Sequence, residues 1–323
     1  MSTAPKISVI LPVRDGEEYL VAALESVVSQ DGPTFETIVI DDGSTDSTPA
    51  ILQDFAGKGI TVLRLEGGGL VSALNAGLAC AQGEYIARMD ADDICLPGRF
   101  AAQAAVLDQD FGTSLVYGAV RIIDDVGRAG HTIAAQPLDA AERHSQLTDA
   151  ISARPIIHPT VMMRRDALDQ VDGYRNAPCA EDHDLWLRTV DDWKFTALPQ
   201  LVLHYRQHSA GVSRARAFES RISHLINCVC DRHRRATGID LYCDRPERYA
   251  AIRSEVVAAV GRRVEDLVQV RKFREAVRAG KVRDAVRSAP RCLLHQPGLL
   301  NPENERVQMR AMQAELFAKL TLT

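Results

Sequence analysis

The sequence predicts an α/β fold in which a mainly parallel sheet, flanked by helices, is followed by a C-terminal helical region. Two patterns carry this prediction. In the first third of the chain, short apolar runs alternate with stretches of helical spacing, and repeated strand, helix, strand units build parallel sheets. From about residue 214 onward, Arg-rich segments with helical periodicity replace that alternation.

Each expected element follows from hydrophobic periodicity. Strands are expected at residues 6–12, 35–41, 60–65 and 83–90, with helices between them at 17–30, 47–56 and 70–82. Later segments predict a strand at 114–124, a strand leading into a helix over 156–168, a helix over 181–188 and a strand over 200–209. The Arg-rich region predicts helices at 214–236, 246–260, 264–288 and 303–320.

The composition is that of an ordinary globular protein. Of 323 residues, 46% are hydrophobic and 25% are charged, and no window approaches the roughly 18 consecutive apolar residues of a membrane-spanning helix. The first residues also lack the features of a signal peptide. Because the seven scattered cysteines form no CxxC pair, we expect reduced thiols in a cytoplasmic protein.

The net charge of −5 conceals a difference between two regions. Residues 1–200 contain 15 Lys and Arg against 30 Asp and Glu, whereas residues 201–323 contain 23 against 13. This asymmetry predicts two functional regions, which we place at residues 1–213 and 214–323.

An acidic cluster ends the fourth predicted strand, at the kind of sheet edge where ligands collect. The sequence DADD supplies Asp90, Asp92 and Asp93. One interpretation is a solvated turn in which Asp93 caps a helix that begins near Pro97. The alternative is a site for Mg²⁺ or Mn²⁺, because these cations take carboxylate oxygens together with substrate phosphates.

A second acidic cluster, DDGSTD, ends the second predicted strand. Gly43 could make a turn and Ser44 or Asp46 could cap the following helix. Alternatively, Asp41 and Asp42 accept hydrogen bonds from a base or ribose at the sheet edge.

Five segments together resemble the inverting nucleotide-sugar glycosyltransferases of family 2, which have the Rossmann-like GT-A fold. They are SVILPVRDGEEYL, IVIDDGSTDST, GLVSALNAGLACAQGEYIARMDADD, EDHDLWLR and HYRQHSAGVS, in the order of the family over residues 5–215. The resemblance implies a metal-dependent hexosyltransferase, with residues 1–213 as its catalytic domain. Its donor is expected to be a UDP-sugar and its acceptor a hydroxyl of a glycan or a lipid-linked molecule, in the synthesis of a cell-surface polysaccharide or glycoconjugate.

The resemblance also assigns roles to individual residues. It places Asp92 on the metal and Asp90 at the ribose or donor sugar, with Asp93 supporting them or facing the acceptor. Asp182, next to Glu181, is the expected general base that takes the proton of the acceptor hydroxyl; stabilisation of a helix start by these two acids is the competing interpretation. The residues expected at the donor nucleotide and its leaving diphosphate are Pro12, Val13, Glu17, Asp41, Asp42, Asn75, Arg206, His208 and Ser213.

The sequence departs from the family at Gly67, Gly68 and Gly69, where many relatives have Asn-x-Gly. The donor contact of that Asn is therefore not expected here, although Asn75 matches a later position of the family. The glycines could themselves form a phosphate-binding loop before the next helix.

The Arg-rich C-terminal region has two interpretations. It is a helical domain with arginines on a solvated face that packs on the catalytic domain or forms a homo-oligomer, or it binds an anionic membrane, a lipid phosphate or an acidic glycan. Peripheral contact with the inner face of the membrane would follow from the second. Few aromatics accompany the arginines, so we expect no nucleic-acid partner.

Two functions of other classes compete with glycosyl transfer. A sugar-nucleotide nucleotidyltransferase would begin with a Gly-rich loop carrying Arg and Lys, which LPVRDGEEYL lacks. A non-catalytic nucleotide-sugar-binding protein would not need acids at every position that the chemistry requires.

Overall fold

The structure, a computed structural model, describes residues 4–148, 156–175, 180–208, 217–278 and 301–319. Contacts divide the chain into two compact units, which are described one at a time. The first comprises Met1–His144, Arg154–Asn176 and Thr189–Ser209, and the second comprises Ser145–Ala153, Ala177–Arg188 and Ala210–Thr323. Residues 177–188 thus group with the C-terminal helices, and the division at residue 213 stays a prediction.

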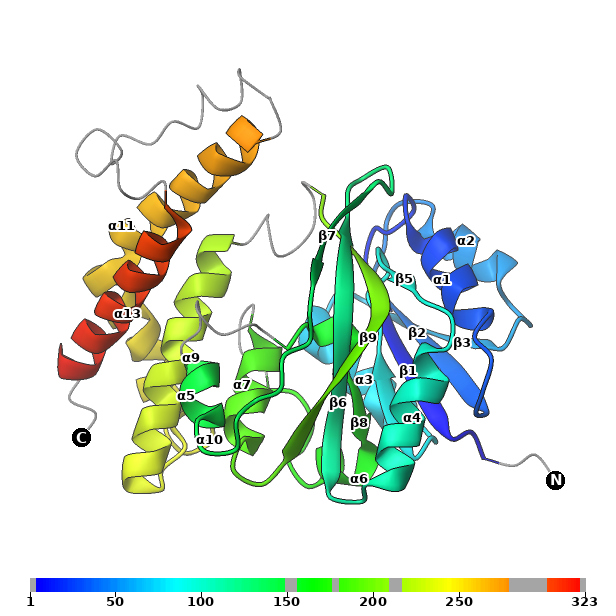
Figure 1. Cartoon of the computed structure of the whole chain (residues 1–323), viewed down its shortest axis with the longest axis horizontal. Coiled ribbons are helices and arrows are strands. Elements are labelled where there is room, and N and C mark those ends of the chain that lie inside the picture. The colour runs from blue at the N-terminus through cyan, green and yellow to red at the C-terminus, as the bar shows by residue number, and fades with distance from the viewer. Residues whose placement is uncertain (1–3, 149–155, 176–179, 209–216, 279–300, 320–323) are drawn as a thin grey trace. The chain divides into compact units, whose positions relative to one another are not determined.

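The first unit is built on one nine-stranded sheet, whose strands run in the order β3-β2-β1-β4-β8-β6-β9-β5, with β7 paired to β6 (Figure 1). β1 to β4 pair in parallel, as do β6 and β9, whereas β8 lies antiparallel between β4 and β6. The strands are β1 Ile7–Val13, β2 Phe35–Asp42, β3 Ile60–Leu65, β4 Tyr85–Arg88, β5 Ile94–Cys95, β6 Thr113–Ile123, β7 Ala129–Ile133, β8 Met162–Arg164 and β9 Lys194–Arg206.

Helices flank this sheet, and the predicted mainly parallel α/β fold is confirmed. In α1, the fully buried Leu20, Leu24 and Val27 recur at helical spacing and join the core formed with β1 and β4. Removing such side chains from water is the main stabilising contribution in a core of this kind. The helical segments of this part are α1 Leu20–Val28, α2 Thr48–Asp54, α3 Leu70–Cys80, α4 Arg99–Gln109, η1 His158–Thr160 and α6 Arg165–Asp169. α5 Arg143–Thr148 begins in the first unit, but its residues from Ser145 onward belong to the second.

β5, β7 and α5 were not predicted, and α4 was anticipated only as the helix near Pro97 that Asp93 could cap. β5, β7 and α5 are short, and α4 presents an alanine-rich stretch with weak periodicity. α4 begins at Arg99 after Gly98 and has no side-chain hydrogen bond at its N-cap. The interpretation of Asp93 as the cap of this helix is therefore wrong.

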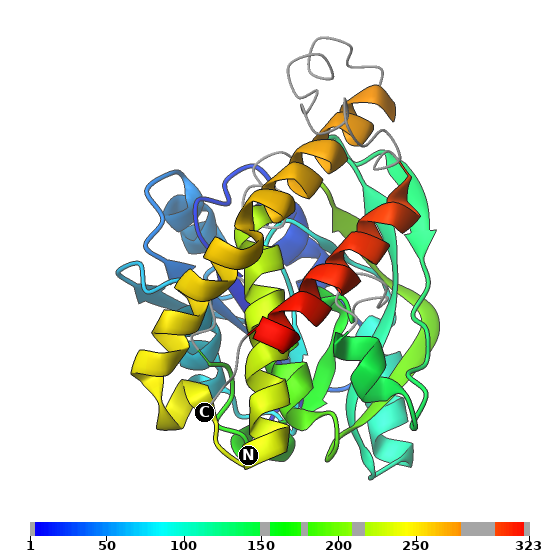
Figure 2. The same cartoon turned by 90° about the vertical axis from the view of Figure 1, so that its left-hand side faces the viewer.

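The second unit consists of helices that share their own apolar core. Buried residues of α9, α11 and α13 pack together, among them Ile226, Val260 and Met312, and the three helices lie side by side in Figure 2. Their bounds, with those of two shorter helices, are α7 Glu181–Thr189, α9 Ala217–Thr237, α10 Leu241–Asp244, α11 Pro246–Arg278 and α13 Pro302–Lys319.

The predicted break between helices at 246–260 and 264–288 is wrong, because α11 continues through Gly261. A glycine inside a helix costs only about 1 kcal/mol, and buried Val260 and Val264 hold the helix on both sides of it. Within the described part of the chain, none of the helices is long and apolar enough to cross a membrane.

Several arginines of the second unit form ion pairs within it. Arg253 binds Glu219 at 2.5 Å, and Arg263 binds Glu315. These pairs favour the interpretation of the basic region as a packed helical domain, whereas binding of a membrane or an acidic glycan stays a prediction.

The close approach of β6 and β9 gives a test of packing. A Cβ added at Gly118 would lie 2.5 Å from a methyl group of Val202, so Gly118→Ala should lower the free energy of unfolding of the first unit by about 1–3 kcal/mol in urea denaturation. Gly130→Ala is the control, because the nearest atom to its added Cβ would lie at 3.4 Å. Equal stability of the two variants would contradict the prediction, and Val202→Ala should restore part of the loss in the double variant.

Candidate active site

The loops after β1 and β2 are joined by reciprocal hydrogen bonds. Val13 pairs with Asp41 across the parallel strands, so both loops leave the same edge of the sheet. The N–H of Asp15 donates to the Ser44 hydroxyl at 2.9 Å, and the Asp15 carboxylate accepts the N–H of Thr45 at 2.7 Å. Asp15 has a φ of 51°, a conformation that Asp tolerates better than most residues.

A second pair of bonds strengthens this connection. Glu17 accepts the N–H of Ser47 at 2.9 Å, while Asp46 accepts the N–H of Glu17 at 3.0 Å and that of Thr48 at 2.9 Å. Partial burial acts to raise the pKa of Asp46, but these donors hold it below its ordinary value. Asp46 thus binds the first N–H of α2, but the N-cap position is Ser47 and has no side-chain hydrogen bond, so the expected cap by Ser44 or Asp46 is wrong. Glu17 serves in the loop connection.

The neighbouring acids Asp41 and Asp42 have different environments, although both are buried. Asp41 is fully engaged, since its oxygens bind the N–H of Ser44 at 2.8 Å and Arg64 at 3.1 Å. In Asp42, Oδ2 accepts the N–H of Gly69 at 2.9 Å, whereas Oδ1 has no hydrogen-bond partner among the described residues. Asp42 therefore has an acceptor available for a ligand, and the glycine segment supplies a donor that fixes its orientation.

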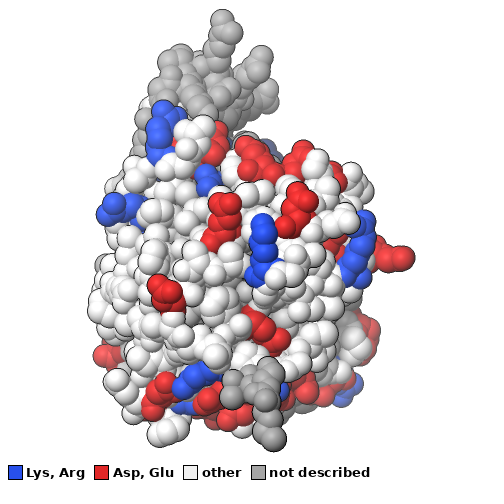
Figure 3. All heavy atoms as spheres, turned by 90° about the vertical axis from the view of Figure 1, so that its right-hand side faces the viewer, with Lys and Arg blue, Asp and Glu red and all other residues white. Residues whose placement is uncertain are grey.

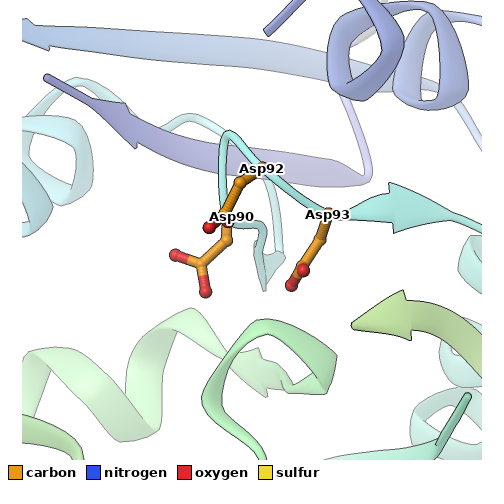
Figure 4. A group of neighbouring side chains, drawn as sticks. All are labelled: Asp90, Asp92 and Asp93. Carbon is orange, nitrogen blue, oxygen red and sulfur yellow. The ribbon is translucent and has the colours of Figure 1, made fainter. Parts of the chain in front are cut away.

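Three carboxylates emerge from the short loop between β4 and β5 (Figure 4). One oxygen from each of Asp90, Asp92 and Asp93 lies within 4.8 Å of the others. Asp93 is fully buried, so the interpretation of this loop as a solvated turn is wrong for that residue. Burial, together with the charges of Asp90 and Asp92, raises the pKa of Asp93 well above its ordinary value, against the opposing effect of the Arg206 N–H and of Arg88.

The chemistry of this cluster fits a hard divalent cation. All three ligands offer oxygen, the atom that Mg²⁺ and Mn²⁺ select. In addition, Oδ2 of Asp93 is buried without a hydrogen-bond partner in the described part of the chain, and such an atom is costly unless something satisfies it. A cation held by these carboxylates would do so and would offset their mutual repulsion.

Two buried arginines that the sequence reasoning missed lie beneath the cluster. Arg88, only 4% exposed, forms an ion pair with Asp90. Arg99, fully buried in α4, donates to the Arg88 carbonyl at 2.8 Å and to the Gln103 amide oxygen at 2.9 Å. A charged residue within the apolar strand YIAR, two positions before Asp90, was the available signal.

Arg206 and His208 approach the same loop from the end of β9. The Arg206 guanidinium donates to the carbonyl oxygens of Asp92 at 2.8 Å and Asp124 at 3.0 Å, and its backbone N–H donates to Asp93 at 2.8 Å. Nε2 of His208 lies 2.9 Å from Oδ2 of Asp92. Tyr19 contacts both side chains: the Arg206 guanidinium lies over its ring, 4.4 Å from the centroid, and the His208 ring meets it edge-to-face with 4.9 Å between centroids. Because its guanidinium binds the main-chain oxygens of Asp92 and Asp124, Arg206 holds the acidic loop in place.

The remaining predicted residues lie elsewhere or are not described. The Asn75 amide exchanges two hydrogen bonds with the backbone of Tyr174, at 2.7 and 3.0 Å, so its visible role is to join α3 to the loop after α6. Glu181 and Asp182 begin α7 in the second unit, where Asp182 accepts the N–H of His183 at 2.7 Å. Ser213 lies outside the described residues.

On the face of the molecule shown in Figure 3, acidic and basic side chains are interspersed among uncharged ones.

Comparison with known proteins defines the class to which this fold and site belong. The profile described as Glycosyl transferase family 2 matches residues 8–172. The putative glycosyltransferase EpsE of Bacillus subtilis is 30% identical over 270 residues, which cover 80% of this chain and 93% of that protein. The O-antigen biosynthesis glycosyltransferase WbnJ of Escherichia coli is 27% identical over 65% of this chain and 82% of its own length.

Solved structures confirm the GT-A fold. S. aureus TarS 1-349 in complex with UDP-GlcNAc superposes with a TM-score of 0.55 at 22% identity, over 87% of this chain and 89% of that one. Mannosyltransferase PcManGT from Pyrobaculum calidifontis, in complex with GDP-Man and Mn²⁺, gives a TM-score of 0.58 at 19% identity, over 98% and 86% of the two chains. The protein is thus a glycosyltransferase, and it belongs to glycosyl transferase family 2.

The buried charge of Asp93 can be tested without any ligand. Asp93→Asn should raise the Tm of the metal-free first unit by about 2–4 °C, the shift that ~1 kcal/mol produces in a domain of this size, because the variant loses a buried negative charge beside Asp90 and Asp92. Asp108→Asn should do the opposite, since Lys6 and Tyr85 bind the Asp108 carboxylate at 2.8 and 2.7 Å. Calorimetry in the presence of a chelator checks both, and a lower Tm for Asp93→Asn would contradict the prediction.

Proposed function

We propose that this enzyme transfers a sugar, with inversion at the anomeric carbon, from a UDP-sugar to a hydroxyl of a glycan or lipid-linked acceptor, and that it requires Mg²⁺ or Mn²⁺. The observation that carries the proposal is the cluster of Asp90, Asp92 and Asp93, whose three carboxylates converge within 4.8 Å. In such a site, the positive charge of a cation offsets the negative charges of the carboxylates and of the bound diphosphate. The complexes of TarS with UDP-GlcNAc and of PcManGT with Mn²⁺ support this choice.

In this proposal, the first two strand ends bind the nucleoside. Pro12 and Val13 border the base, and Asp42 accepts a hydrogen bond from it through Oδ1, the oxygen without a partner among the described residues. Asp41 and Glu17 hold the loops in place. A base that presents an N–H beside a carbonyl, as uracil does, fits a single available acceptor.

The loop after β4 serves the diphosphate and the donor sugar. Asp92 would hold the cation, whose chemistry is to neutralise negative charge that develops on the leaving diphosphate. Asp90 accepts hydrogen bonds from the ribose or the donor sugar, and His208, within 2.9 Å of Asp92, adds a donor on the same side. Arg206 keeps the loop in position, as its bonds to main-chain oxygens indicate.

Asp182 is the proposed general base. It removes the proton of the acceptor hydroxyl as that oxygen attacks the anomeric carbon from the face opposite the leaving group, which produces inversion. Asp182 lies in the first turn of α7, where its carboxylate accepts the N–H of His183 at 2.7 Å. Glu181, largely buried beside it, shapes the same helix start.

We further propose a role in cell-surface polysaccharide synthesis, which is supported by the 27% identity of this chain to WbnJ, a glycosyltransferase of O-antigen biosynthesis. The nucleotidyltransferase and non-catalytic alternatives find no support among the relatives described above. Cytoplasmic location and peripheral membrane contact stay predictions.

Donor and metal dependence can be measured together. The enzyme is incubated with UDP-GlcNAc, UDP-Glc, UDP-Gal or GDP-Man, and release of the nucleoside diphosphate is followed with Mn²⁺, with Mg²⁺ or with EDTA. We expect release from a UDP-sugar, its loss in EDTA and its recovery with either cation. Asp92→Ala should lose about 10²-fold or more of the activity, as expected for removal of a group that stabilises leaving-group charge. Full activity in EDTA would contradict the metal requirement.

The base is tested by Asp182→Asn, which keeps the shape of the side chain and removes its basicity. Release of UDP should fall by about 10²–10⁴-fold, the range for loss of general base catalysis, while the Kd for UDP with Mn²⁺ measured by calorimetry stays unchanged. Asp169→Asn, an exposed aspartate at the end of α6, is the matched control and should keep wild-type activity. Wild-type turnover by Asp182→Asn would exclude Asp182 as the base.

A further inference from the structure

The N-terminal end of α7 is tied to the C-terminal helical region by a buried side chain. Asn227 of α9, only 5% exposed, donates from Nδ2 to the Ala180 carbonyl at 3.0 Å. The same carbonyl accepts the N–H of Asp184 at 3.1 Å, as part of the first turn of α7. Because a carbonyl oxygen has two lone pairs, Asn227 fixes the helix start without competing with the helix itself.

The C-terminal end of α7 is held from the same helix. Arg234 of α9 donates to the Leu187 carbonyl at 2.9 Å, one of the last carbonyls of α7, which lack partners within the helix. Asp231, 4% exposed, binds both Arg234 and Arg235, so the guanidinium is itself oriented. A cation at this end also interacts favourably with the helix dipole.

A third point of attachment lies next to Asp182. His183 is 6% exposed, its Nε2 lies 3.0 Å from the Leu147 carbonyl of α5, and its ring centroid lies 4.5 Å from that of His224 on α9. A carbonyl only accepts, so Nε2 carries the proton. Burial, followed by the neighbouring His224, lowers the pKa of His183 to about 3, and the ring stays neutral at physiological pH.

We infer that Asn227 and Arg234 are positioning residues for catalysis, in that α9 holds α7 at both ends and thereby fixes the direction of the Asp182 carboxylate. The inference rests on the proposed role of Asp182 as the base. It gives the C-terminal region a part in the transfer step, distinct from any binding of a membrane. A general base must lie within hydrogen-bond reach of the proton that it removes, and a displacement of about 1 Å can cost about 10²-fold in rate.

Four variants test the inference. Asn227→Leu and Arg234→Met remove the donors and keep similar side-chain size, and Arg234→Lys retains a cation that can donate to the Leu187 carbonyl. Arg232→Met is the matched control, because Arg232 is an exposed arginine of the same helix that stacks on Phe317 of α13. Release of UDP is measured with Mn²⁺ and the active UDP-sugar of the panel UDP-GlcNAc, UDP-Glc and UDP-Gal, together with the Kd for UDP and hydrogen exchange of the amides in residues 181–189.

We expect kcat to fall by about 10-fold or more in Asn227→Leu and Arg234→Met, with KM for the donor and Kd for UDP within about twofold of wild type. Exchange of the α7 amides should accelerate in the same two variants. Arg234→Lys should recover most of kcat, and Arg232→Met should behave as wild type.

Wild-type kcat in both donor-removing variants would overturn the inference, and so would an equal loss in Arg234→Lys and Arg234→Met. A parallel loss of UDP affinity would also overturn it, because that result indicates general destabilisation. If Asp182→Asn retains wild-type turnover, the base assignment fails, and the inference fails with it. If Asp182→Asn is inactive while Asn227→Leu and Arg234→Met are fully active, the inference alone fails.

Discussion

Negative charge gathered at one loop is the constraint on which the candidate site of the first unit depends. One oxygen from each of Asp90, Asp92 and Asp93 lies within 4.8 Å of the others, and Asp93 is fully buried, so water screens its repulsion by the other two carboxylates poorly. Buried Arg88 and the donors of Arg206 offset part of this repulsion. The remaining repulsion is unfavourable, and a divalent cation held by the three carboxylates would offset it.

The sheet is what allows so much charge to be placed there. β1, β2 and β4 pair in parallel, so the segments that follow them reach one edge, although they are far apart in the sequence. These strands are mostly apolar and buried, and the acidic residues of the site lie at or just after their carboxyl ends. The buried strands therefore fix where the loops of the site begin. Hydrogen bonds between the loops then fix the positions of these loops relative to one another.

The sequence predicted correctly those features that depend only on neighbouring residues. Strands β1 to β4, helices α1 to α3 and the acidic clusters follow from periodicity and from residue type, and they were predicted within a few residues. The side chains of Asn75 and Arg206 donate hydrogen bonds to the carbonyl oxygens of Tyr174 and Asp92, which lie about 100 residues away in the sequence. No local sequence pattern could predict these bonds. The continuity of α11 through Gly261 was missed for the same reason, because tertiary burial outweighs helix propensity.

The reciprocal bonds between the loops after β1 and β2 also limit how the protein can change. Asp15 and Glu17 bind the backbone of Thr45 and Ser47, while Ser44 and Asp46 bind the backbone of the first loop in return. A chimera that received only one of these loops from a relative would leave donors of the other without acceptors. The two loops are therefore structurally interdependent, and a substitution that removes a side chain from one of them leaves a backbone donor of the other without its acceptor.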